Sequence, residues 1–505
     1  MKLSTRRAVP ALALTLTLLA TAACGGSDGG DDPGGDAAGG TLTAAGPIPI
    51  ENLDPHGPSS MDAGTQLAAR ALFSQLVVST GPGEFTGDLA TGWEPNDDTS
   101  RWTFTLRDGV EFSDGEPVDA DAVVASFERV LELQGPLAGN FVDYQVEAPD
   151  EATVVFDAGK PDASFVAKIS SFFVTPAGVD EAFFQDPVGS GPFVVESFEP
   201  GQALRMTPNP TYWDGPPALE ELVFQSIPEV SARMTALQTG EVDVTWAMPD
   251  DQIPALQGDT SITVESVDSP GVLTMWMNSA EETLQEAAVR RALWQAVDFE
   301  EITASLFPET GSAADSVVSP VVLGYAPQEP VTYDPEAAKA ALDDAGFDYD
   351  TTLRMQFSQP QFRQLAQAVA SDLAEIGVQV EPLEKEQAVF LEDLLALKWD
   401  INIQQIGSQG YDAATNLGRL YPCAAGRTGY CNEDLDELLA AAEATSDTAE
   451  REDLYAQATQ IVWDDAVGMY PMFVGMPYAW RSGVEGFVPA SDSLPYFTRV
   501  TNSES

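Results

Sequence analysis

Short strands and helices that alternate from Thr41 onward constrain the fold of this chain more than any other feature of its sequence. Residues 102–106 alternate apolar and polar side chains, which is the period of a half-buried strand. Residues 365–376 instead place apolar side chains at helical spacing, and Gly377 ends that pattern before the strand 378–380 begins. Because both periods recur along the chain, we expect an α/β protein with mixed sheets.

Capping residues mark where other elements begin and end. Asp119 and Asp334 are typical helix N-caps. Pro335 follows the second of them at the first helical position, and Gly346 stands just past the end of that helix. Further strands are expected at 192–198, 203–207, 242–246, 262–267, 272–277, 400–406 and 468–474.

The length of the chain indicates more than one domain. A single core rarely grows beyond ~250–300 residues. This chain has 505 residues, and 44% of them are hydrophobic. We therefore expect two or three domains, each with enough apolar side chains for a core of its own.

The charge of the chain is strongly acidic. It has 80 acidic and 23 basic residues, a formal net charge of −57. Nucleic acids and anionic membrane surfaces are bound through clustered Lys and Arg, so both are excluded as partners. The charge favours capture of a cationic or zwitterionic solute. An alternative interpretation is that the acidity is a general property of the host's proteins.

The first forty residues indicate export rather than fold. Lys2, Arg6 and Arg7 precede an apolar run at 11–20, which is shorter than the roughly 20 residues that span a bilayer. This pattern predicts a signal peptide over 1–23, by the general or the twin-arginine route. The residues before Cys24 resemble a bacterial lipobox, with Thr21 where Leu is usual, so Cys24 is expected to carry a lipid anchor. The alternative is a cleaved signal followed by a free linker.

A flexible tether is expected over 24–40, because Gly, Asp and Ala dominate it and cannot bury apolar surface. Two further cysteines, Cys423 and Cys431, lie close in sequence. In an exported chain such a pair is expected to form a disulfide that closes a short loop.

Catalytic chemistry finds little support in the sequence. His56 is the only histidine and lies in a turn-like stretch, which argues against Ser-His-Asp and Cys-His sites. No zinc-binding or phosphate-loop motif occurs, so neither a metal site nor a cofactor is expected. Carboxylates are abundant, but nothing singles out a catalytic pair. We expect a chain that is not an enzyme, with an extracellular hydrolase as the weaker alternative.

Seven stretches, in order and over most of the chain, resemble bacterial extracellular solute-binding proteins of family 5, which serve peptide, nickel and opine-type ATP-driven (ABC) importers. Trp102–Val123 is the most specific of them, and it carries two Asp-Gly turns. The others are Pro187–Phe193, Asn209–Trp213, Leu237–Asp243, Val289–Leu293, Tyr333–Ala338 and Tyr430–Leu439.

The resemblance implies a type II periplasmic-binding-protein-like fold, with two lobes joined by two crossover strands near 267–273 and 478–486. Lobe I is expected to comprise 41–60, 180–268 and 485–505. An inserted subdomain of lobe I is expected at 61–179, and lobe II at 269–484. Ligand would lie between the lobes, and its binding would favour the closed form.

The resemblance also implies a function. We expect a monomeric, extracellular substrate-binding lipoprotein that captures a peptide or peptide-like solute and delivers it to the permease subunits of an ABC importer. The alternatives are an opine, a sugar or a metal chelate as the solute, or a sensor built on the same fold.

The ligand contacts are inferred from the same resemblance. The resemblance implies that peptide-binding members use an acidic side chain, shortly before an Asp-Pro or Glu-Pro corner of the second lobe, to pair with the ligand's amino group. If Asp412 matches that corner, the position falls on the neutral Gln409, and Asp412 itself is the possible substitute.

The candidate ligand contacts come from the start of the body, the first crossover and this corner. Packing is the alternative role for the two tryptophans among them, and a solvated helix charge is the alternative for the arginine. They are Ile48, Pro49, Ile50, Trp246, Trp276, Asn278, Arg363, Ile406, Gly407, Ser408, Gln409, Tyr411 and Asp412.

Overall fold

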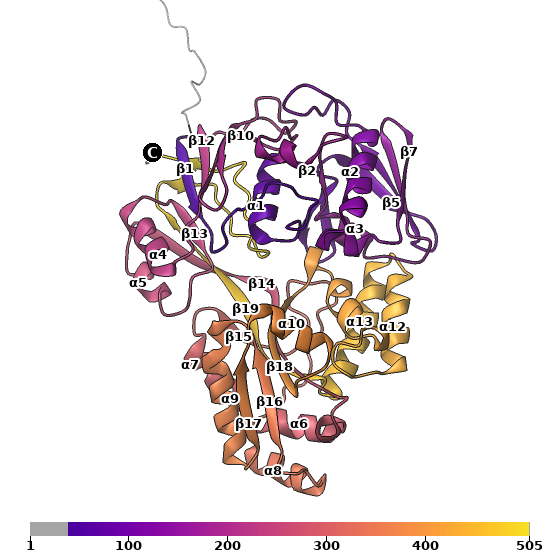
Figure 1. Cartoon of the computed structure of the whole chain (residues 1–505), viewed down its shortest axis with the longest axis vertical. Coiled ribbons are helices and arrows are strands. Elements are labelled where there is room, and N and C mark those ends of the chain that lie inside the picture. Colours follow the sequence, from indigo (N-terminus) through magenta and orange to yellow (C-terminus); the bar gives the residue numbers. More distant parts are fainter. Residues whose placement is uncertain (1–38, 504–505) are drawn as a thin grey trace, which may run out of the picture. The chain divides into compact units, whose positions relative to one another are not determined.

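One mixed sheet of 11 strands passes from lobe I into lobe II (Figure 1). The computed structural model describes residues 39–503, so the predicted signal peptide, Cys24 and most of the tether lie outside the described residues. The strand order is β10 (Phe193–Glu199), β11 (Ala203–Pro208), β12 (Glu221–Gln225), β1 (Thr41–Ala45), β13 (Val244–Trp246), β19 (Gly468–Arg481), β14 (Ile262–Met277), β18 (Ile401–Gly407), β16 (Thr352–Phe357) and β17 (Gln379–Glu384), with β15 (Gly311–Ala313) on β19. The structure has the α/β class that the sequence periodicity predicts and the two-lobed type II fold that the family resemblance implies.

The strands β14 and β19 join the lobes as an antiparallel pair. In lobe I, β19 pairs with β13, and in lobe II, β14 pairs with β18. The register of β14 against β19 shifts between Asp268 and Val272, within the expected first crossing. Opposite this shift lie Phe473 and Gly475 of β19. The second crossing therefore precedes the expected range 478–486, because residues 478–480 already pair with β13.

Pro270 and Gly271 explain why two strands were expected where one occurs. Pro and Gly normally mark a strand end or a bulge. Here they lie at the register shift inside β14, which is a single strand of 16 residues. A bulge of this kind bends a strand and increases its twist, which suits a segment that changes lobes.

The two lobes and the inserted subdomain have separate apolar cores. One core lies within 272–473, a second within 76–174, and a third is built from 42–73, 173–246 and 478–500. The first of these cores defines lobe II, the second defines the inserted subdomain, and the third defines the rest of lobe I. Three segments differ from the expected bounds, because α1 (Ala63–Leu72), Phe173 and the residues from Tyr478 to Val484 pack into the lobe I core.

The inserted subdomain is a four-stranded sheet with one long helix packed on it. The strands are β5 (Ala90–Pro95), β6 (Arg101–Leu106), β8 (Thr153–Asp157) and β7 (Gln145–Asp150), in that order. The helix α2 (Ala120–Leu133) starts at the expected cap, where Asp119 accepts a hydrogen bond from the Ala122 amide at 3.0 Å. Phe127 of this helix meets Phe156 of β8 at a ring distance of 5.0 Å.

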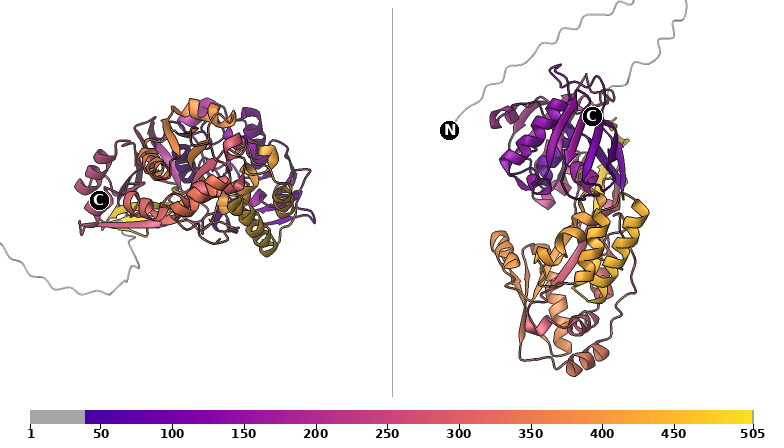
Figure 2. Two further views of the ribbon diagram at one scale, coloured as in Figure 1. Left: turned by 90° about the horizontal axis from the view of Figure 1, so that it is seen from below. Right: turned by 90° about the vertical axis from the view of Figure 1, so that its right-hand side faces the viewer.

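Helices cover the sheet in lobe II. The expected cap also starts α8 (Pro335–Asp344), where Asp334 accepts from the Ala337 amide at 2.9 Å. Figure 2 shows α12 (Glu433–Glu443) and α13 (Thr448–Asp464) next to the inserted subdomain, where the Thr99 hydroxyl donates to the Glu443 carbonyl at 2.9 Å. Cys423 and Cys431 form a disulfide in the loop between α11 (Leu417–Leu420) and α12.

The remaining elements are short or lie outside the cavity described below. They are β2 (Ser74–Gln75), β3 (Val77–Gly81), β4 (Glu84–Gly87), α3 (Phe165–Ile169), β9 (Phe173–Val174), α4 (Val230–Thr239), α5 (Ile253–Gln257), α6 (Ala287–Gln295), α7 (Phe299–Leu306), α9 (Arg363–Glu375), α10 (Gln387–Leu395), β20 (Val484–Glu485) and β21 (Thr501–Asn502).

Candidate ligand-binding site

A cavity with two chambers lies between lobe II and the two parts of lobe I. The larger chamber has a volume of about 580 Å³, and the smaller one about 320 Å³. Met61, Gly407 and Gln409 line both chambers. The inserted subdomain contributes Asn140, Tyr144, Asp162 and Lys168 to the larger chamber, and lobe II contributes Thr415, Arg419 and Glu443.

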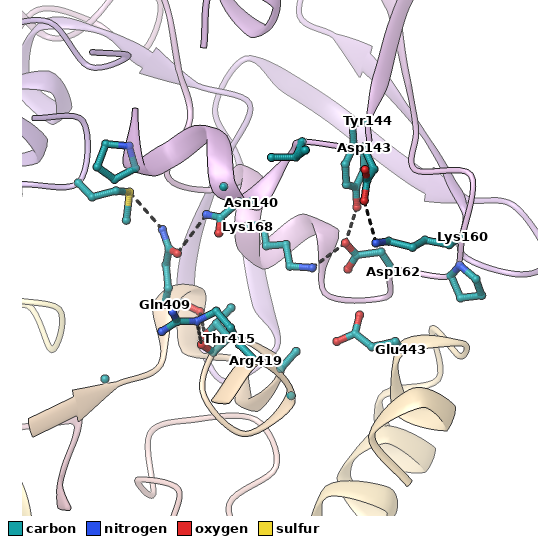
Figure 3. Close-up of a pocket in the computed structure, with 18 residues that line it drawn as sticks. Asn140, Asp143, Tyr144, Lys160, Asp162, Lys168, Gln409, Thr415, Arg419 and Glu443 are labelled. Atoms are coloured by element: carbon teal, nitrogen blue, oxygen red, sulfur yellow. Dashed lines mark hydrogen bonds and ion pairs between the residues drawn. The ribbon is translucent and has the colours of Figure 1, made fainter. Parts of the chain in front are cut away.

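Gln409 spans the gap at the boundary between the two chambers (Figure 3). Its Oε1 accepts a hydrogen bond from Asn140 Nδ2 at 3.3 Å, and its Nε2 donates to Ser171 Oγ at 2.6 Å. The next residue, Gly410, has a positive φ of 61°, and a Cβ there would lie 2.5 Å from the Ala167 carbonyl oxygen. Glycine is therefore required for this loop to approach the inserted subdomain so closely.

Asp162 anchors the wall of the larger chamber on the inserted subdomain. Its carboxylate pairs with Lys168 Nζ at 2.6 Å and accepts from the hydroxyls of Ser164, at 2.6 Å, and Tyr144. Burial would raise the pKa of Asp162, but Lys168 and these hydroxyls outweigh it and hold the pKa below its ordinary value. This wall therefore presents an ion pair that is already satisfied.

Glu443 lies at the end of α12, facing Asp162, and joins lobe II to the inserted subdomain. Its backbone carbonyl accepts from Thr99 Oγ1 and from the Ala163 amide, both at 2.9 Å, and its Oε2 lies 3.2 Å from Ser164 Oγ. Burial, and then the charge of Asp162, raise the pKa of Glu443 to about 8. Near neutral pH this side chain therefore favours its uncharged form.

Arg70 is a basic residue that lines the smaller chamber. It pairs with Asp492 at 2.8 Å and lies 4.4 Å from the ring centroid of Tyr496. Gln66, Ser79, Ser171 and Tyr411 are further polar residues of this chamber. The chamber thus combines an aromatic surface with hydroxyl and amide groups, a mixture typical of small-solute sites.

Four of the sequence-predicted contacts line this cavity, namely Gly407, Ser408, Gln409 and Tyr411. Their neighbours do not. Ile406 is a buried residue of β18. Asp412 is 1% exposed, forms an ion pair with Arg451 at 2.9 Å and caps the Ala414 amide at 3.0 Å. The structure therefore gives Asp412 an internal partner and no exposure to solute.

The other predicted contacts lie away from the cavity. Trp246 is 3% exposed and stacks on Tyr478 in the lobe I core, since its strand is central in the sheet. Trp276 donates to the Tyr421 hydroxyl at 3.0 Å, and Asn278 donates to the Trp399 carbonyl at 2.9 Å. Each of these groups is buried and has a protein partner.

Two further predictions also fall outside the cavity. Arg363 is exposed and pairs with Glu384 at 2.8 Å, which matches the alternative role of a solvated helix charge. Residues 48–50 line a separate hollow of about 10 Å³, too small for a solute beyond the size of a water molecule.

Several residues of the cavity were missed by the sequence analysis. Arg70 is the only charged residue in α1, a signal that could have singled it out. Asp492 lies 422 positions further along the chain, and Glu443 lies 281 positions after Asp162, so no local pattern joins these pairs. The residues are Met61, Gln66, Arg70, Asn140, Asp162, Lys168, Ser171, Arg419, Glu443, Asp492 and Tyr496.

His56 has a structural environment. It is fully buried, its Nε2 lies 2.8 Å from the Phe173 carbonyl oxygen, and its ring stacks on Phe172. Burial lowers the pKa of His56 to about 4, so the ring is neutral at physiological pH. It packs at the junction of the inserted subdomain with the rest of lobe I.

The sequence profile described as "Bacterial extracellular solute-binding proteins, family 5 Middle" matches residues 84–427, more than half of the chain. The chain belongs to this family. It is thus a solute-binding protein of the extracellular family 5, as the sequence motifs predict.

Relatives of this family 5 protein are named for binding rather than for catalysis. The probable D,D-dipeptide-binding periplasmic protein of Escherichia coli (strain K12) is 31% identical, over 81% of this chain and 83% of the relative. The dipeptide-binding protein of the same organism is 27% identical, over 88% of this chain and 92% of the relative. The solved structure of HbpA2 from Haemophilus parasuis has a TM-score of 0.82 at 25% identity, and covers 92% of this chain and all of that one.

Proposed function

We propose that this protein is the substrate-binding lipoprotein of an ABC importer, and that it captures a peptide or peptide-like solute between its lobes for delivery to the permease. The cavity lined by both lobes carries this proposal. Its chambers fall within the range of about 300–1,000 Å³ that small-solute sites occupy. The two dipeptide-binding relatives support a peptide as the solute.

Closure around the solute follows from the way the lobes are joined. Within residues 39–503, only the strands β14 and β19 run through both lobes, and Gln409 and Glu443 reach across from lobe II to the inserted subdomain. A solute that contacts both walls binds the closed form more strongly than the open one and shifts the equilibrium toward it. A permease that recognises the closed form would then receive loaded protein selectively.

Peptide binding is tested by thermal unfolding of the purified protein with a panel of di- and tripeptides. A ligand at one hundred times its dissociation constant stabilises the folded form by about 2.7 kcal/mol, so the melting temperature should rise with peptide concentration. Sugars, opines and metal chelates form the comparison set. Stabilisation by one of these and by no peptide would contradict the proposed solute, and turnover of peptides or esters would contradict a binding role.

Replacing Gln409 with glutamate is expected to tighten binding of a peptide with a free amino group. The substitution is accommodated, because Asn140 Nδ2 and Ser171 Oγ can both donate to a carboxylate. A charge-assisted bond to an ammonium group is roughly twice as strong as a neutral one, so we expect affinity for tri-alanine to increase several-fold. Titration calorimetry measures this, with N-acetylated tri-alanine as the control, and an equal gain for both peptides would place the amino group elsewhere.

Replacing Cys24 with alanine is expected to release the protein from membranes. Each buried CH₂ of an acyl chain contributes about 0.8 kcal/mol to anchoring, and no helix in residues 39–503 is long and apolar enough to cross a bilayer instead. Fractionation of expressing cells should find the wild-type protein with the membranes and the variant in the soluble fraction. If the wild-type protein is also found in the soluble fraction, the free-linker alternative holds.

A further inference from the structure

Among the basic residues that the structure describes, most pair with a carboxylate, and Arg419 and Arg427 do not. Acidic residues outnumber basic ones by 80 to 23, so a basic side chain is rarely far from a carboxylate. In the larger chamber, Lys160 pairs with Asp143 at 3.1 Å and Lys168 with Asp162 at 2.6 Å. Within the described part of the chain, no ion pair joins Arg419 or Arg427 to an acidic residue.

The surrounding backbone holds the Arg419 guanidinium in place. Its Nε donates to the Thr415 carbonyl at 3.0 Å, one turn back along the chain, which leaves its two terminal nitrogens without a protein acceptor in residues 39–503. Figure 3 shows this side chain in the wall of the larger chamber, on the same side as Gln409. Two free terminal nitrogens form the fork that binds a carboxylate through parallel hydrogen bonds.

Arg427 adds a second positive charge close enough to act on the first. It lies in the loop that the disulfide between Cys423 and Cys431 closes, which limits its freedom to move away. Partial burial, and then the charge of Arg427, lower the pKa of Arg419, so the two cations repel each other in the absence of a ligand. An anion at Arg419 would relieve this repulsion.

We propose that Arg419, supported by Arg427, is a subsite of the larger chamber that binds a carboxylate of the captured solute. The proposal rests on the function proposed above and specifies its solute class, namely a compound with a free carboxylate. A short peptide that extends from Gln409 into this chamber would reach the subsite with its carboxyl terminus. An acidic side chain of the solute offers the same chemistry from another source.

The test compares tri-alanine with tri-alanine amide by titration calorimetry, on the wild-type protein and on Arg419→Gln. A hydrogen-bonded charge pair contributes enough that its loss should lower the affinity for tri-alanine about ten- to one-hundredfold. The amide should bind both proteins equally and weakly. Arg427→Gln should give a smaller loss, and Arg499→Gln, which removes an exposed arginine that pairs with Asp214, should give none.

The outcomes of these measurements decide the proposal. Equal wild-type affinity for tri-alanine and its amide, or an equal loss of both in Arg419→Gln, overturns it. Recovery of affinity when a glutamate side chain is added to the amidated peptide supports it and identifies the side chain as the second source of the carboxylate. If the wild-type protein binds no peptide, the proposed peptide function fails, and the subsite is tested separately by thermal unfolding with succinate and with succinamide. Stabilisation of the wild-type protein by succinate, abolished in Arg419→Gln, supports the subsite. No stabilisation of the wild-type protein by succinate overturns the subsite.

Discussion

Replacing Glu443 with glutamine is expected to remove most of the pH dependence of ligand binding and to tighten binding at pH 7.5. Glu443 lies where α12 meets the inserted subdomain, and its contacts with Ser164, Thr99 and Ala163 exist only while the lobes are together. Opening the lobes hydrates the carboxyl group and returns its pKa toward the ordinary value of 4.5. Closing the lobes therefore favours the protonated form of this group.

The charges around Glu443 explain why it has no counterion of its own. Asp162, Lys168 and Tyr144 face it from the inserted subdomain, and Asp412, Arg451 and Tyr455 from lobe II. Lys168 is paired with Asp162, and Arg451 with Asp412. An ionised Glu443 would add a third carboxylate to two that already use the available cations.

The direction of the pH effect follows from the raised pKa. Below pH 4.5 the carboxyl group is protonated in both forms, and the closed form is favoured in full. Between pH 4.5 and about 8 the closed form holds a proton that the open form has lost, so each unit of pH lowers the closing equilibrium by up to tenfold. Above about pH 8 the penalty is constant.

Titration calorimetry between pH 5.5 and 8.5 measures this effect. For the wild-type protein, affinity should fall as the pH rises, and binding near pH 7 should take up a proton from the buffer. Glu443→Gln should show neither. Glu437→Gln, on the exposed side of the same helix, should behave like the wild type. A pH profile that is flat in the wild-type protein would contradict the role given to Glu443.

The sequence predicted the elements of the fold well, because their signals are local. Asp119 and Asp334 cap helices as expected, and the strand at 102–106 lies in the inserted subdomain's sheet. The single strand β14 was missed, because Pro270 and Gly271 resemble a break in any short window. Only its long-range pairing with β18 and β19 shows that the strand continues through them.

The site was predicted less completely, because burial and pairing depend on distant parts of the chain. Trp246, Trp276 and Asn278 have side chains that often contact ligands. In the folded protein they instead contact Tyr478, Tyr421 and Trp399, respectively. The loop from Gly407 to Tyr411, which lines the cavity, was predicted through its resemblance to the family. Arg70 and Glu443 were not, since their partners lie hundreds of residues away.

Replacing Arg451 with glutamine is expected to destabilise lobe II by about 3–5 kcal/mol, because it leaves the carboxylate of Asp412 buried without a counterion. The pair is almost inaccessible to water, and Arg451 Nη2 lies 2.9 Å from each oxygen of Asp412. Unfolding in urea, followed by tryptophan fluorescence, measures the loss. Arg363→Gln removes an exposed pair with Glu384 and should cost at most about 1 kcal/mol.

The double variant Asp412→Asn, Arg451→Met separates the two possible sources of this loss. If the cost of Arg451→Gln comes from an uncompensated charge, removing both charges should restore much of the stability. The Asp412→Asn substitution keeps a side-chain oxygen for the cap on the Ala414 amide, so the loop that carries Gln409 should retain its shape. Ligand affinity of the double variant should then remain close to that of the wild type. A double variant as unstable as Arg451→Gln would mean that the arginine acts through packing against Tyr455 rather than through its charge.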